Sequence, residues 1–132
     1  YIIPDIKVIY YARENFKGLS KNNYSNGLWN ILTAYYTSVL TSLSLRHFIP
    51  LFFVASLLMT LRFSVIYFNA IYLFVMILFT YLLTMLMRSI YISNKDSSVL
   101  YVLLSFFVLH FSYGIGSLVG LIKTVKLVLT WH

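Results

Sequence analysis

Acidic residues are almost absent from this sequence. It has three carboxylates in 132 residues, far apart along the chain, and no two of them share a helical face: Asp5, Glu14 and Asp96. General acid–base catalysis and metal-dependent transfer both need carboxylates placed together. No DxD pair, HExxH motif or glycine-rich phosphate loop occurs either. The residues present therefore predict no catalytic site in this chain.

Cysteine is missing altogether, which excludes disulfides and cysteine-ligated metals but leaves the cellular compartment open. The three histidines lack the spacing of metal ligands: His47, His110 and His132. No metal site and no bound cofactor is predicted within the chain.

Charge of either sign is scarce: 61% of the residues are hydrophobic and 10% are charged, which is the composition of a membrane protein. A net charge of +7 could indicate nucleic acid binding. The basic residues, however, occur singly at the edges of apolar runs, where lipid head groups would meet them. We therefore expect the lipid bilayer, and no nucleic acid, as partner. The residues concerned are Arg46, Arg62, Arg88, Lys95, Lys123 and Lys126.

The longest apolar stretch, 48–87, holds forty residues with one charge, Arg62. Forty residues suffice for about two bilayer crossings of roughly 20 residues each. Arg62 lies where a hairpin would turn, so the stretch predicts two membrane spans, 48–67 and 69–88. A pair of buried helices in a soluble core is the alternative, but 132 residues are too few to cover it.

A third span is predicted at 99–122, which carries no formal charge and completes a transmembrane region over 47–132. His110 lies within it. Ionisable residues inside a span are candidates for function. The alternative is a neutral histidine bonded to a neighbouring helix or to a tyrosine hydroxyl, and for a lone histidine we favour that interpretation.

Small residues recur every four positions in this third span, which places them on one helical face: Ser112, Gly116 and Gly120. Such a face lets another helix approach closely within a membrane. We expect these residues to pack against another helix, one from the 48–87 hairpin.

Two further segments precede the spans. β-Branched and aromatic residues dominate 1–13, which predicts a short β-strand, and a lone strand needs partners. Because the chain begins at Tyr1, without Met, we expect it to be a piece of a longer protein and the strand to be the edge of a missing domain. Segment 14–46 reads as amphipathic helices at the membrane interface, with Lys17 and Lys21 toward head groups. A connecting helix with a solvated face is the alternative.

The sequence thus predicts an all-α membrane protein of about three transmembrane helices, preceded by the strand and an amphipathic interfacial helix. In that topology six basic residues would lie on the N-terminal side and three on the other, which favours a cytoplasmic N-terminal side. The three are Arg62, Lys123 and Lys126.

Four segments, in this order, carry a family resemblance: PDIKVIYYAR, NFKGLSKNNYSNGLWN, LSLRHFIPLFFV and LHFSYGIGSLVGLIK. Together they resemble the region that follows the catalytic domain in family 2 glycosyltransferases of the exopolysaccharide (succinoglycan-type) group. The likeness covers about residues 4–123. It implies a multi-pass protein of the bacterial inner membrane and a role in exopolysaccharide biosynthesis.

The resemblance also implies an activity that this chain would not itself perform. A cytoplasmic GT-A domain would transfer a sugar from a nucleotide donor to a lipid-linked or polysaccharide acceptor, with a divalent metal, Mg or Mn. Its aspartates would precede Tyr1, so this piece would be the non-catalytic anchor. A small non-enzymatic membrane protein, acting as a scaffold or transporter subunit, is the alternative.

The resemblance implies that residues of 14–46 lie on the side of the protein that faces the acceptor. Asn22 and Ser25 stand where the family has Gln and Arg, which weakens the expectation of processive synthesis and of direct acceptor contact through these two positions, while Gly27 and Trp29 match. The candidates for the interfacial, acceptor-side site are Lys17, Lys21, Asn22, Gly27 and Trp29.

Overall fold

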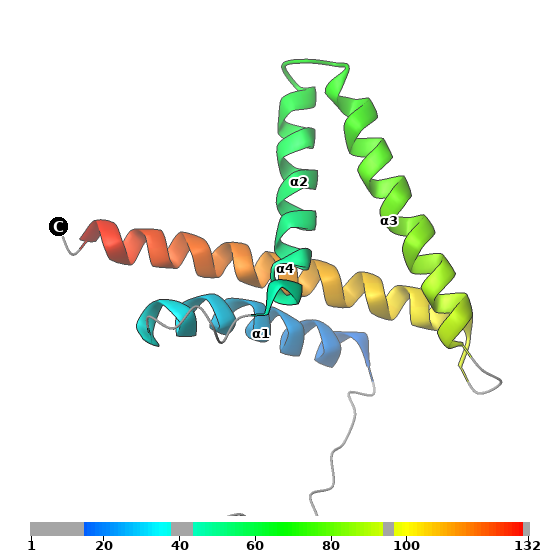
Figure 1. The fold of residues 1–132 in the computed structure, drawn as a ribbon, viewed down its shortest axis with the longest axis horizontal. Coiled ribbons are helices and arrows are strands. Elements are labelled where there is room, and N and C mark those ends of the chain that lie inside the picture. Colours follow the sequence, from blue (N-terminus) through cyan, green and yellow to red (C-terminus); the bar gives the residue numbers. More distant parts are fainter. Residues whose placement is uncertain (1–14, 38–43, 94–96, 131–132) are drawn as a thin grey trace, which may run out of the picture.

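A computed structural model describes residues 15–37, 44–93 and 97–130. In these ranges the chain forms four α-helices and one short 3-10 helix and contains no strand (Figure 1). The elements are α1 (Phe16–Thr37), η2 (Leu45–His47), α2 (Ile49–Ser64), α3 (Ala70–Ile92) and α4 (Val99–Thr130). The all-helical expectation is therefore confirmed for the described residues. The strand predicted at 1–13 lies outside them.

Helices α3 and α4 are long and apolar enough to span a membrane, with 23 and 32 residues. Helix α2 has 16 residues and rises about 24 Å, less than the roughly 30 Å of a hydrocarbon core. The three predicted spans thus correspond to two helices of spanning length and a shorter one. Their boundaries also differ, because α3 begins at Ala70 and α4 continues as one helix past Lys123.

The hairpin of α2 and α3 turns between Ser64 and Ala70, close to the position expected from Arg62. Pro50 occupies the first turn of α2, where its missing N–H breaks no helical hydrogen bond. Few residues of α3 are buried, and large side chains such as Tyr72 and Phe79 are exposed along it. Exposed apolar surface on this scale indicates contact with lipid or with another protein.

The helices form layers, with α4 in the middle (Figure 1). Helix α1 lies beside α4 and runs in the same direction. The α2–α3 hairpin extends from the opposite side of α4, and α2 is steeply inclined to α4. Within the hairpin, Phe53 stacks on Tyr81 with ring centroids 4.1 Å apart and meets the edge of Phe111 on α4 at 5.4 Å. This aromatic cluster joins α2, α3 and α4.

Helix α1 is less amphipathic than its sequence suggested, because apolar and polar residues are only weakly separated between its faces. Its buried residues include Asn23 and Gly27 as well as Leu32 and Ala34. The physical reason is that the face turned to α4 needs small side chains where the two helices approach closely. Small residues include polar types, such as Ser20, as well as glycine and alanine.

Candidate functional site

The packing of α1 on α4 positions every candidate site residue of α1. A Cβ atom built on Gly27 would lie 2.1 Å from the carbonyl oxygen of Tyr113, and one on Gly116 would lie 2.1 Å from that of Tyr24. Both distances are far below a van der Waals contact. The two backbones therefore touch, and glycine alone fits at both positions.

Hydrogen bonds run along the same seam between α1 and α4. The Ser20 and Ser112 hydroxyl oxygens are 2.8 Å apart, and the Ser117 hydroxyl donates to the Gly27 carbonyl oxygen at 3.3 Å. Gly120 is less crowded, since its added Cβ would lie 3.0 Å from the Leu28 carbonyl oxygen. Hydrogen bonds of this kind stabilise a close helix pair because they satisfy polar groups that the packing buries.

The seam corrects one expectation, that the Ser112–Gly116–Gly120 face packs on the hairpin. All three residues lie against α1. The small residue that packs against the hairpin is Gly114, because a Cβ atom added to it would lie 2.4 Å from the Pro50 carbonyl oxygen. Spacing identifies which face of a helix is small, but it carries no information about which neighbour occupies that face.

A polar cluster of three helices, which sequence reasoning missed, adjoins the seam. The Asn30 side-chain amide of α1 donates to the Tyr113 hydroxyl of α4. The His47 ring of η2 stacks on Tyr113 with centroids 6.4 Å apart, and the Ser44 backbone N–H donates to His47 Nδ1 at 3.1 Å. The sequence feature that could have indicated this cluster is Asn30, because an asparagine next to an apolar run needs a hydrogen-bond partner once it is buried.

His110, the intramembrane candidate, bonds within its own helix. Its Nδ1 is 2.9 Å from the Phe106 carbonyl oxygen, which can only accept, so Nδ1 carries the proton. The Tyr81 hydroxyl lies 3.5 Å from the same oxygen, and its ring meets His110 edge-on at 5.7 Å. Within the described ranges no three His, Cys, Asp or Glu residues gather around a possible metal position. The contacts describe a packing role for His110.

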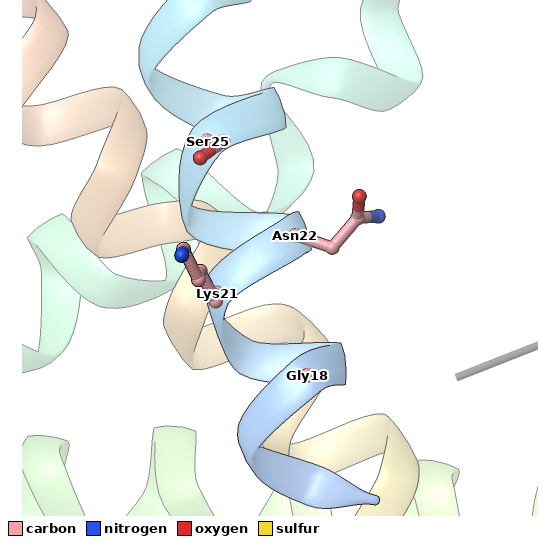
Figure 2. A pocket seen from close by; sticks show the side chains of 4 residues that line it. All are labelled: Gly18, Lys21, Asn22 and Ser25. Atoms are coloured by element: carbon pink, nitrogen blue, oxygen red, sulfur yellow. The ribbon is translucent and has the colours of Figure 1, made fainter. Parts of the chain in front are cut away.

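The acceptor-side candidates of α1 divide between two faces. Gly27 faces α4 in the seam. Lys21 and Asn22 instead line an open hollow of about 320 Å³ together with Gly18 and Ser25, and their side chains diverge from the helix (Figure 2). This face points away from the seam.

Trp29 continues the same outward face, four residues beyond Ser25 and seven beyond Asn22. Its side chain is 58% exposed. The stripe of Gly18, Asn22, Ser25 and Trp29, named here the outward face of α1, combines amide, hydroxyl and indole groups. Such groups can bind a polar ligand with an apolar ring face, but the described residues place no acid–base pair beside them.

Lysines line two further hollows beside α1. Lys17 and Lys21 border one of about 370 Å³, whose other walls include Ser112 and Ile115. The second, of about 460 Å³, lies between the C-terminal ends of the two helices; its lining is Leu32, Tyr36, Lys123, Lys126, Leu127 and Thr130. No aspartate or glutamate falls within the described ranges, so these ammonium groups have no carboxylate partner there.

Comparison with family models, with curated proteins and with solved structures found no match to this chain. The family resemblance of its four segments therefore stays a prediction.

Proposed function

We propose that this chain is the membrane-anchoring C-terminal part of a bacterial glycosyltransferase. The whole protein would transfer a sugar from a nucleotide-sugar donor to a lipid-linked or polysaccharide acceptor at the inner membrane, in exopolysaccharide biosynthesis. This part would hold the acceptor side and perform no chemistry. The divalent metal, Mg or Mn, would be bound by the catalytic domain that the resemblance places before Tyr1.

The observation that carries the proposal is the outward face of α1. Glycine contacts hold the opposite face of α1 on α4, so the outward face is fixed in orientation while remaining open. An indole ring packs well on the C–H face of a sugar, and amide and hydroxyl groups bond its hydroxyls. Lys17 and Lys21 lie beside this face and suit the phosphates of a lipid-linked acceptor.

The described charge pattern supports the expected orientation. Lys17 and Lys21 accompany the outward face, and Arg46 lies at the base of the hairpin. A cluster of basic residues on one side of a membrane favours the cytoplasm for that side. The nucleotide-sugar donor is made there, which suits a catalytic domain attached at the N-terminal end of the chain.

The decisive test is the coding sequence upstream of Tyr1. The proposal expects an open frame that contains a clustered acidic motif within a few dozen residues, and a DxD pair further upstream. Roughly two hundred upstream residues, a domain's length, without either motif would refute it. A start codon immediately before Tyr1 would favour the alternative, a small non-enzymatic scaffold or transporter subunit.

A transfer assay tests the outward face itself. Membranes holding the whole protein receive radiolabelled UDP-glucose, UDP-galactose or GDP-mannose, and label in the lipid and polysaccharide fractions is counted. We expect Trp29→Ala to lower transfer about tenfold, equal to a lost contact of roughly 1.4 kcal/mol. Tyr72→Ala is the matched control, because Tyr72 is an exposed aromatic residue on α3, away from the outward face of α1. Equal activity of the two variants would remove the outward face from the proposal.

A further inference from the structure

Two lysines of α1 lie beside the middle of α4. Lys17 and Lys21 share a hollow with Ser112 and Ile115, which are central in the uncharged run 99–122. If α4 crossed the bilayer with this run in the lipid, both ammonium groups would lie near the bilayer centre, where a charge is strongly unfavourable. No carboxylate in the described ranges could offset them. An α4 that stands upright and crosses the bilayer is therefore inconsistent with the positions of Lys17 and Lys21 on the neighbouring helix α1.

The two sides of α4 also differ in character. Phe111 and Gly114 mark the side that meets α2. Helical spacing places on this side most of the large apolar side chains that α4 leaves exposed: Leu100, Leu104, Phe107, Leu121, Ile122, Val125 and Leu129. Lys123 and Lys126 lie on the side of α1, where they line the hollow with Leu32 and Tyr36. In the C-terminal part of α4, exposed apolar residues on one side and cations on the other resemble the arrangement of a helix lying in a membrane surface.

The hairpin projects from the apolar side of α4 (Figure 1). Pro50, Phe53 and Val54, in the first two turns of α2, make its close contacts with α4, so the rest of α2 extends away from that helix. Arg62 lies near the distant tip of the hairpin, and Arg88 lies in the last two turns of α3, at the opposite end of that helix from the tip. The hairpin is thus apolar between one arginine at its tip and the layer that holds the other cations.

We infer that α1 and α4 form a platform docked on one face of a phospholipid bilayer, and that the α2–α3 hairpin alone crosses the membrane, with the exposed apolar tip 65–68 extending the short helix α2. The apolar side of α4 dips into the lipid beside the hairpin. The lysines of the platform meet the anionic head groups, and the outward face of α1 is turned to water. This places six described cations on the platform side and Arg62 on the other; the six are Lys17, Lys21, Arg46, Arg88, Lys123 and Lys126.

The platform has a consequence for topology that does not depend on the proposed function. The sequence predicted a third span, with the end of the chain on the side opposite to residue 94. With α4 in the membrane plane, Thr130 lies on the same side as α1. The two arrangements share every helix and differ only in where the bilayer lies.

Single cysteines decide between them, because the chain has none of its own. The full chain is placed in sealed membrane vesicles of each orientation and exposed to a membrane-impermeant maleimide. Asn26→Cys on α1 and Asn69→Cys at the hairpin tip, both exposed positions, report the two sides. We expect Thr130→Cys to react in the vesicles in which Asn26→Cys reacts. Reaction together with Asn69→Cys, or from neither side, would overturn the inference.

A matched pair of neighbours tests how α4 lies. Val125 and Lys126 are adjacent and exposed, but one is on the apolar side and the other on the side of α1. We expect Lys126→Cys to react in intact vesicles and Val125→Cys to react only after detergent is added. In an upright α4 both would lie at the same depth and react alike. Equal labelling in intact vesicles would refute the in-plane helix, and labelling in detergent shows that each variant is present.

Discussion

Gly116→Ala is the sharpest perturbation of the α1–α4 seam, because it adds one methyl group where two backbones touch. That carbon would lie 2.1 Å from the Tyr24 carbonyl oxygen, 2.9 Å from its carbonyl carbon and 3.1 Å from the Leu28 nitrogen. Backbone atoms within a helix cannot move aside as a side chain can. The helices must separate locally by about 1.3 Å to restore an ordinary contact of about 3.4 Å.

The expected cost follows from that separation. Overpacking by a methylene-sized group costs roughly 1–3 kcal/mol. The separation also lengthens the Ser20–Ser112 bond, now 2.8 Å, and the Ser117–Gly27 bond, now 3.3 Å, beyond useful range. Each such hydrogen bond contributes about 0.5–1.5 kcal/mol. We therefore expect Gly116→Ala to lower the free energy of unfolding by roughly 2–6 kcal/mol.

The measurement is unfolding of the purified protein in mixed micelles as the fraction of SDS is raised. Gly18→Ala is the matched control, because Gly18 lines the open hollow on the outward face of α1. There the same substitution should raise the free energy of unfolding by about 0.5–1 kcal/mol, because glycine loses more conformational freedom than alanine when it becomes part of a helix. If Gly116→Ala unfolds at the same SDS fraction as Gly18→Ala, the reasoning about backbone contact is wrong.

Two more variants distinguish backbone contact from a general intolerance of substitution. Gly120→Ala should cost less than Gly116→Ala, since its nearest contacts are at 3.0 Å. Gly27→Ala should cost about as much, and the Gly27→Ala/Gly116→Ala double variant less than the sum of the two. Once one methyl group has separated the helices, the second meets less resistance. Strict additivity would contradict a shared seam.

Three further changes test the other contacts of α4. Tyr113→Phe removes the hydroxyl that accepts from Asn30, and we expect a loss of roughly 0.5–1.5 kcal/mol in the same SDS titration. Phe53→Ala opens the aromatic cluster and should cost about 2–4 kcal/mol, whereas Phe52→Ala, on an exposed position, should change stability by less than about 1 kcal/mol. Similar losses for the two would show that the cluster is not a core. His110→Gln should cost less than about 1 kcal/mol, since the imidazole bonds only its own helix; a larger loss would show that another element depends on it.

Composition and periodicity were sufficient for the helical character of the described chain and for the position of its hairpin. Uninterrupted apolar runs cannot stay in water, and one arginine within forty residues marks where they turn. The same patterns predicted a small face on the last helix. In each case the property belongs to a single helix or a single loop, which is why a linear pattern can reveal it.

A linear pattern could not predict how the candidate site residues of α1 divide between the two faces of that helix. Asn22, Gly27 and Trp29 fall within eight consecutive residues, but a helix turns by about 100° per residue, so Gly27 faces α4 and the other two face outward. Which face is covered depends on the neighbour. Asn30 and Tyr113, 83 positions apart, meet only because α1 lies against α4.

The pattern of residues was sufficient to predict a long apolar helix at α4 with a face of small residues. It could not predict that α1 occupies this face, that the hairpin packs on the opposite side, or that Lys17 and Lys21 lie beside the centre of α4; these follow from the packing of the helices. The physical reason is that hydropathy measures how well one segment tolerates lipid, whereas the position of a helix in a membrane depends on every charge packed against it. An apolar run that would span alone is held at the surface by the polar helix bound to it.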